Sequence, residues 1–345
     1  MSSFGERLRS ARKMKGWSLQ DLADNMTTAI TKQSLSKYES GDMQPSGDML
    51  IALSKALGVK PEYFFRESSI ELPEPEFRKS YALSAKEIDS IKERVKEFLE
   101  RYLETEQFLN IRENFINPLK KDVIHNEHDA DKAAVKLLKG WQLGFDPIPS
   151  VLEMLENRGV RIMEIDGPEA FDGMSTYAGD IPVIIINRNY AIERKRFTAL
   201  HELGHLVLQI AKGADKEKIC HAFAGAMLLP DDTPQRLLGE KRNNIAMGEL
   251  VSIKEQFGIS VQATMMRAYL KGIISSATLN RFFRSIASNK KEEGLGSFAG
   301  KEKTYRFEHL VFRLAAEDIV SLSKAANLAG MRLAEFRDKL DAYSK

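Results

Sequence analysis

The sequence has little cysteine, little net charge and no long hydrophobic run. Its 345 residues include one cysteine, which excludes a framework of internal disulfides and, with no secretory signal, favours a reducing cytoplasm. The 51 basic and 49 acidic side chains leave a formal net charge of +2, which argues against a histone-like protein. The longest apolar runs, such as residues 181–186, are far shorter than a membrane span, so we expect no membrane association.

The length and composition predict several globular domains. A domain usually takes about 150 residues, and 43% hydrophobic with 29% charged residues is a normal balance for packed cores. We expect a multidomain, mainly α protein with a small central sheet. Its predicted segments are a five-helix bundle (1–66), a linker and long helix (67–124), an α+β core (125–230), a helical extension (231–287), and, after a polar, glycine-rich linker, a C-terminal helical module (301–345).

Helix signals are clearest near the N-terminus. Apolar residues keep helical spacing from Phe4 onward until Gly16 interrupts them, Ser18 can cap a helix over 19–26, and Thr31 can cap one over 32–40. Another amphipathic helix follows around 49–57, and a short turn opens at Pro61.

The next segment begins with a proline-rich, acidic linker near residues 71–75 and continues as one long helix from Ser84. Its apolar residues are spaced three and four apart, a pattern that favours packing within the chain and could also form a coiled-coil homodimer seam. These residues are Ile88, Ile91, Val95, Phe98 and Tyr102.

The centre of the chain alternates between helix and strand. The pattern predicts helices over 130–141, 148–158, 194–210 and 216–229, strands over 160–165 and 183–186, and turns at Asp172-Gly173 and Gly179-Asp180. A further helical stretch carries a pair of helices around Gly258 that could form a second helix-turn-helix-like unit.

A metal-binding motif stands at His201-Glu202-Leu203-Gly204-His205. Residues four apart on a helix differ by about 40° in direction, so both imidazoles project from one face and can hold one zinc ion. Glu202 lies beside them and can take a proton from a zinc-activated water. The pattern therefore predicts a Zn²⁺ site with Glu202 as the catalytic base.

A catalytic zinc site needs a third protein ligand. Glu217 is the leading candidate, because a turn at Gly213 could bring its helix alongside the first. His221, one helical turn further, is a second candidate, and Glu217 could instead be a solvated charge.

These residues carry a family resemblance. The stretch 196–205, with Glu217, Ala222-Phe223-Ala224 and Leu228-Leu229-Pro230, resembles the ImmA/IrrE zinc metallopeptidases over roughly residues 125–285. The resemblance implies a zincin-like α+β core, with His201, His205 and Glu217 as zinc ligands and Glu202 as general base. The family usually has asparagine where this chain has His221, which puts a substrate-facing role at that position in doubt.

Three further residues invite hypotheses about regulation or catalysis. A thiolate at Cys220 could occupy the open zinc position and keep the enzyme latent, although a small buried residue is the plainer interpretation. Tyr177 and His221 are weak candidates for stabilising an oxyanion.

The N-terminal bundle resembles the XRE or phage-repressor helix-turn-helix family. The resemblance rests on Leu22-Ala23, residues 31–41, Pro45-Ser46 and Ala56-Leu57-Gly58-Val59, and implies that the helix from Lys32 enters the DNA major groove. Gln33 would then read adenine edges, Ser34 would contact either a base or a phosphate, and Lys32 and Lys37 would contact phosphates of a double-stranded operator. Ten basic and seven acidic residues give this segment a charge of +3, and we expect its basic cluster at 7–15 to contact DNA.

Residues 307–311, 316, 319–321, 324–326 and 328 resemble the C-terminal segment of proteins that join these two domains. Their helix-turn-helix pattern could contact a partner or DNA, although ordinary packing within the chain is the plainer interpretation. Together the resemblances imply a DNA-binding transcription regulator with a zinc endopeptidase that cleaves a repressor- or antitoxin-like protein during stress or mobile-element induction. The alternative is a non-proteolytic regulator whose peptidase-like domain is a sensor or interaction platform. A third hypothesis is DNA-triggered autocleavage in the linker at 71–76.

Overall fold

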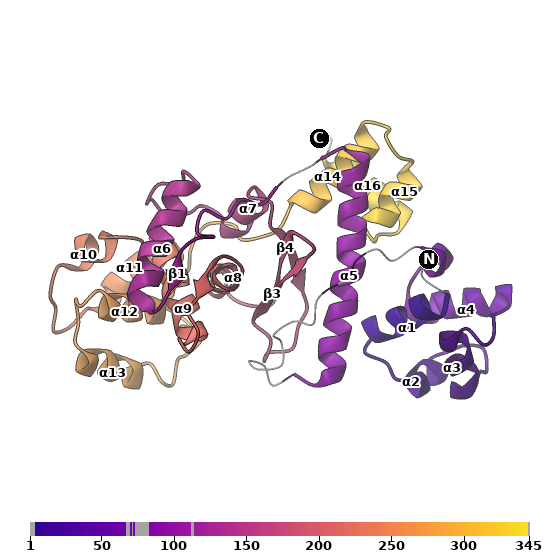
Figure 1. Cartoon of the computed structure of the whole chain (residues 1–345), viewed down its shortest axis with the longest axis horizontal. Helices are drawn as coiled ribbons and strands as arrows, with labels where there is room; N and C mark the ends of the chain where they lie inside the picture. Colours follow the sequence, from indigo (N-terminus) through magenta and orange to yellow (C-terminus); the bar gives the residue numbers. More distant parts are fainter. Residues whose placement is uncertain (1–3, 67–69, 71, 73–82, 112–113, 344–345) are drawn as a thin grey trace. The chain divides into compact units, whose positions relative to one another are not determined.

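A computed structural model describes residues 4–66, 70, 72, 83–111 and 114–343. The chain forms two units: unit 1 comprises 1–111 and 308–345, and unit 2 comprises 112–307. Helices dominate, and the strands of the described residues all lie in unit 2, so the expected multidomain, mainly α class with a small sheet is confirmed (Figure 1). No described helix is long and apolar enough to cross a membrane. Of the linker at 71–76, only Leu72 falls within the described residues.

Unit 1 begins with the expected bundle. Its elements are α1 (Phe4–Met14), α2 (Leu19–Asp24), α3 (Lys32–Ser40), α4 (Gly47–Leu57) and the 3₁₀ helix η1 (Pro61–Phe65). Hydroxyl oxygens of Ser18 and Thr31 accept hydrogen bonds from backbone N–H groups, which confirms the predicted N-caps of α2 and α3. Leu35 and Tyr38 of α3 are buried in the core of this bundle.

Unit 1 also contains the long helix α5 (Ala85–Phe108) and the C-terminal helices α14 (Arg306–Ala316), α15 (Leu322–Leu328) and α16 (Leu333–Tyr343). Ile91, Val95 and Tyr102, which the sequence offered as a coiled-coil seam, are buried within the single chain. They are therefore not available to a second copy.

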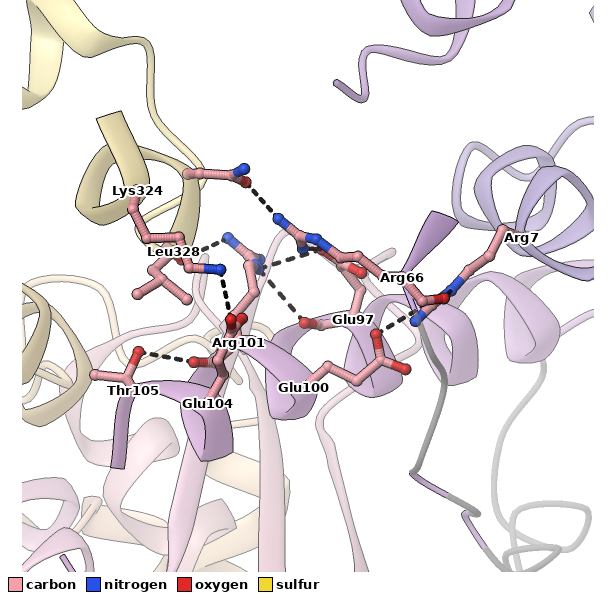
Figure 2. A network of polar contacts seen from close by, with 10 residues as sticks. Arg7, Arg66, Glu97, Glu100, Arg101, Glu104, Thr105, Lys324 and Leu328 are labelled. Atoms are coloured by element: carbon pink, nitrogen blue, oxygen red, sulfur yellow. Dashed lines mark hydrogen bonds and ion pairs between the residues drawn. The ribbon is translucent and has the colours of Figure 1, made fainter. Parts of the chain in front are cut away.

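Charged side chains on one side of α5 bind both sequence-distant parts of unit 1 (Figure 2). Glu100 pairs with Arg7 of α1 at 2.8 Å, and Arg101 donates to the carbonyl of Leu328 at the end of α15. Arg66, just after η1, donates to Asn327 at 2.6 Å. Burial raises the pKa of Glu97, which lies between Arg66 and Arg101 in this network.

The N-terminal half of unit 2 holds a three-stranded sheet in the order β2-β4-β3. The buried strand β4 (Ile181–Asn187) pairs in parallel with β2 (Arg161–Ile165) and antiparallel with β3 (Gly173–Ala178). The chain reverses between β3 and β4 at Gly179, whose φ of +61° is in the left-handed region. The hairpin turn predicted at Gly179-Asp180 is therefore confirmed.

Helices cover this sheet and build the large core of unit 2. The first set comprises α6 (Glu127–Gly140), α7 (Val151–Glu156), α8 (Ile192–Val207) and α9 (Lys216–Leu228). The second set comprises α10 (Thr233–Leu238), α11 (Met247–Phe257), α12 (Val261–Leu270) and α13 (Ser276–Ser285). Helix α8 packs on β3, β4 and α9, so the predicted metal motif lies at the junction of sheet and helices (Figure 1).

Two local predictions are wrong. Gly173 does not form a turn but begins β3, where a Cβ would approach Cγ2 of Thr198 to 2.6 Å; the glycine permits close approach to α8. Residues 209–210 are not helical but form β5, which pairs in parallel with β1 (Val123–Ile124). Helix α8 ends before them because Leu208 has an extended backbone.

The polar segment at 288–300 is not a loose linker as predicted. Glu292 is buried, pairs with Lys254 at 3.0 Å, and accepts hydrogen bonds from the backbone N–H groups of Val261 and Gln262 at the start of α12. A carboxylate at a helix N-terminus is electrostatically favourable. The segment therefore packs against the rest of unit 2 and has a defined path.

Glu302 extends this attachment to α8. Its carboxylate pairs with Arg196 at 2.7 Å, and neither side chain has any exposed surface. The same carboxylate accepts a hydrogen bond from the backbone N–H of Leu152 in α7. The guanidinium of Arg196 donates to the carbonyl of Gly258 and lies 4.2 Å from the centroid of the Phe298 ring. We call residues 298–304 the strap.

Replacing Arg196 tests the buried pair. Arg196→Met leaves Glu302 buried and unpaired, so we expect the free energy of unfolding of unit 2 to fall by about 3–5 kcal/mol. The chain has two tryptophans, so in a Trp17→Phe background urea unfolding followed by fluorescence reports on Trp141 of unit 2. In the control Arg188→Met, an exposed pair with Asp166 is lost, and we expect less than about 1 kcal/mol. Equal losses in the free energy of unfolding would show that the buried pair stabilises unit 2 no more than an exposed pair does.

Candidate metal centre and nucleic-acid interface

Helix α8 presents the two histidines of the motif on one face, as predicted. Nε2 of His201 and Nε2 of His205 are 3.1 Å apart. Glu217, in the first turn of α9, brings one carboxylate oxygen to 3.2 Å from His201 and the other to 3.5 Å from His205. Within the described part of the chain, these three residues form a group able to hold a metal ion.

The spacing of these donor atoms fits zinc. A tetrahedral zinc ion with bonds of about 2.0–2.1 Å requires ligand atoms about 3.4 Å apart. The observed separations of 3.1, 3.2 and 3.5 Å lie close to that value. Two imidazoles and one carboxylate are also ligands that zinc prefers and leave a fourth position for water or substrate. The residues present therefore fit the expected ion.

Glu217 reaches this position because α8 and α9 pack side by side after the turn at Gly213, whose φ is +86°. Gly204 allows the close approach, since a Cβ there would lie 3.2 Å from Sγ of Cys220 on α9. The hydrogen bond to His201 lowers the pKa of Glu217 to about 2, so the side chain is a carboxylate at neutral pH.

Glu202 is buried and lies toward the sheet. Its Oε2 accepts a hydrogen bond of 2.7 Å from Oγ of Ser175 on β3. Sequence reasoning missed Ser175, although its place in the Met174–Ala178 stretch next to a buried strand was a usable signal. The hydroxyl holds one oxygen of the carboxylate in a fixed orientation.

The sulfur of Cys220 lies on the far side of a ligand ring. It is buried, and Sγ is 3.6 Å from Nδ1 of His205, the ring nitrogen opposite Nε2. Burial raises the pKa of this thiol, which disfavours the thiolate. This position differs from the open zinc position that the latency hypothesis requires. Nδ1 of His201 is buried with no hydrogen-bond partner among the described residues.

His221 lies beside the three donors but is not one of them. Its ring stacks between Phe197 and His201, with centroid distances of 5.8 and 4.3 Å, and Nδ1 lies 2.7 Å from the carbonyl oxygen of Glu217. Burial and the neighbouring His201 lower its pKa, which favours the neutral ring. Tyr177 donates its hydroxyl to the carbonyl of Leu206 at 2.9 Å.

The helix predicted to enter DNA presents polar side chains at its surface. Lys32, Gln33 and Lys37 of α3 are exposed and Ser34 is half-buried. Thr31 Oγ1 caps the helix by accepting a hydrogen bond from the backbone N–H of Ser34. Three of the four side chains can therefore reach a ligand without unfolding the bundle.

Four of the five cations in the basic cluster at 7–15, which we expected to contact DNA, have acidic partners within unit 1, while Arg9 and Lys15 are exposed. Arg7 is buried against Glu100, and Arg12 is paired with the buried Glu39 at 2.6 Å. Lys13 pairs with Asp89 of α5 at 2.9 Å. These cations stabilise unit 1, because each is held by an acidic partner that the local sequence did not reveal.

Comparison with protein families identifies two classes of domain in the chain. Residues 8–64 match the helix-turn-helix family model of the XRE type, and residues 155–269 match the model for the IrrE N-terminal-like domain, peptidase family M78. The chain thus carries an XRE-type helix-turn-helix domain followed by an IrrE-like domain with a metallopeptidase-like fold. Both expected resemblances are confirmed.

Two curated relatives are regulators by name. The chain is 41% identical over 63 residues to the "SPbeta prophage-derived uncharacterized HTH-type transcriptional regulator YonR" of Bacillus subtilis, covering 18% of this chain. It is 36% identical over 87 residues to the "HTH-type transcriptional regulator DicA" of Escherichia coli, covering 25% of this chain. The matches span 56% and 63% of those relatives' lengths.

A solved structure of Bacillus thuringiensis PlcR with the peptide PapR7 and DNA aligns over 100% of this chain and 98% of that one. Its sequence identity is 12% and its TM-score 0.18, which is too low to compare the two folds.

Removing the carboxylate ligand tests the centre. We expect Glu217→Gln to weaken zinc binding at least about 100-fold. Loss of a residue that only hydrogen-bonds to a zinc ligand already weakens binding by about 10–100-fold, and loss of a ligand itself should cost more. Competition with a chromophoric chelator measures the dissociation constant. Glu240→Gln, an exposed glutamate away from the centre, is the matched control and should bind zinc like the wild type. If the two variants bind equally, Glu217 is not a ligand, and His221→Ala tests the second candidate.

Proposed function

We propose that this protein is a DNA-binding transcription regulator whose IrrE-like domain is a zinc-dependent endopeptidase. The observation that carries the proposal is the convergence of His201, His205 and Glu217 at tetrahedral spacing, with the buried Glu202 adjoining on the same helix. A domain used purely for sensing or contact can hold a metal with its ligands alone and has no need of a catalytic base. The adjoining base favours a peptidase over the non-proteolytic alternative.

In this proposal His201, His205 and Glu217 hold the ion. When bound, zinc supplies positive charge that polarises a peptide carbonyl and acidifies water. Glu202 accepts the proton of the attacking water and delivers it to the leaving amine of the cleaved bond. Ser175 orients Glu202 through its hydrogen bond to Oε2. Tyr177, whose hydroxyl already bonds to Leu206, is poorly placed to stabilise an oxyanion.

The DNA-binding part of the proposal rests on α3. Its exposed Lys32 and Lys37 suit phosphate contacts, and Gln33 and Ser34 suit base edges in the major groove of a double-stranded operator. Helix-turn-helix proteins commonly bind paired half-sites as dimers. We therefore extend the proposal to a cytoplasmic protein that binds its operator as a homodimer. That dimer cannot use the buried seam of α5.

The substrate we propose is a repressor- or antitoxin-like protein. A regulator that carries its own peptidase can end repression by destroying a protein rather than by losing affinity for DNA. The relatives support this setting, since both are regulators by name and one is described as prophage-derived.

The peptidase is tested by Glu202→Gln. Loss of a general base costs about 10²–10⁴-fold in rate, so proteins that disappear from cells expressing the wild type should persist in the variant. Quantitative mass spectrometry of the two cell lines measures this, with Glu240→Gln as the control. Zinc content is measured in parallel to show that the centre remains loaded. If regulation is unchanged in the zinc-loaded variant, the protein acts without proteolysis.

DNA contact by α3 is tested by Lys37→Ala. A phosphate contact contributes about one unit to the slope of log affinity against log salt. We therefore expect Lys37→Ala to weaken binding to a mixed-sequence duplex and to reduce that slope by about one. Lys55→Ala removes an exposed lysine from α4 of the same bundle and should leave the slope unchanged. Equal slopes for both variants would place the DNA elsewhere.

A further inference from the structure

Unit 2 contains a groove of about 1240 Å³ next to the candidate metal centre. Its walls come from the start of α8, from α9, from α12 and from the segment 290–292. Small-molecule pockets usually measure about 300–1,000 Å³. The groove is therefore large enough for several residues of an extended or helical peptide.

The groove reaches the metal centre through two aromatic rings. Phe197 and His221 both line it, and the centroid of the His221 ring lies 4.3 Å from that of the His201 ring. A polypeptide with one bond at the metal would consequently have neighbouring residues within reach of this groove.

One wall of the groove is an exposed apolar face of α12. Met266, Tyr269 and Leu270 all line it, and their side chains are 40%, 39% and 38% exposed. Large apolar side chains gathered on a surface mark a binding site more often than isolated ones do. Helix α9 contributes the small residues Ala222 and Gly225 to the same groove, which leaves room for side chains of a ligand.

Five of the six lysine and arginine side chains that line this groove have acidic partners within the chain. Lys254 pairs with Glu292 at 3.0 Å, and Arg267 is buried against Asp131. Neither charge needs an anionic ligand to satisfy it. The wall formed by α12 therefore offers contact with apolar side chains.

We propose that this groove binds an apolar segment of the protein substrate next to the scissile bond, with Met266 as a residue that determines specificity. This inference rests on the proposed peptidase function. It identifies the substrate class as polypeptides with large aliphatic or aromatic side chains near the cleavage point, held between α9 and α12.

Hydroxamates that chelate zinc test the groove on the zinc-loaded full chain. The first probe is acetohydroxamate. The other two carry a leucyl-phenylalanine unit on one or the other side of the hydroxamate, so that they extend from the metal in opposite directions. We expect one dipeptide probe to bind at least 100-fold tighter than acetohydroxamate by calorimetry. Met266→Ser should reduce that ratio about tenfold. Met247→Ser is the matched control, because Met247 is 37% exposed and lies outside the groove.

The outcomes separate the groove from the metal centre. If acetohydroxamate binds but neither dipeptide gains affinity, or if both methionine variants behave alike, the groove proposal is overturned and the peptidase proposal stands. If acetohydroxamate does not bind, the peptidase proposal fails. Leucyl-phenylalanine amide, which lacks the chelating group, then tests the groove alone by NMR shifts that Met266→Ser should remove. If Met266→Ser instead changes only the sedimentation of the protein, the groove is a contact between copies, which also overturns the proposal.

Discussion

The guanidinium of Arg196 is a charge with no exposed surface, and the position of α8 depends on it. Such a charge is tolerated only when it is paired and fully hydrogen-bonded, so its partners must come together whenever the domain folds. Those partners lie in the residues just before α7, in the residues before α12 and in the strap. Because α8 is one continuous helix, the contacts that hold Arg196 in its first half also orient the two histidines in its second half.

The local parts of the site could be predicted, and the distant ones could not. His201, Glu202 and His205 follow from helical geometry, because side chains four apart share a face. Glu217 was reachable because Gly213 signals a reversal between two amphipathic helices. The partner of Arg196 was not predictable, since Glu302 lies 106 residues further along the chain in a segment of polar composition.

Composition does not reveal which charged side chains have partners within the chain. The cluster at 7–15 looks like a DNA-facing surface, yet Arg7 and Arg12 are held by Glu100 and Glu39. Glycine misled for a related reason: Gly173 is needed for contact between β3 and α8, and no local signal distinguishes that use from a turn. Both cases show that the function of a residue type depends on contacts between segments that are far apart in sequence.

Unit 1 combines an N-terminal and a C-terminal segment of the chain. This composition sets the order in which the protein can fold during synthesis. The hydrogen bond from Arg66 to Asn327 spans 261 residues, and ribosomes add about 5–20 residues per second. The helix-turn-helix bundle has a largely local core, so it can fold as soon as it emerges. The charged side of α5 that receives α15 must wait tens of seconds longer, while unit 2 is made. A folded helix-turn-helix domain thus precedes the completed unit to which it belongs.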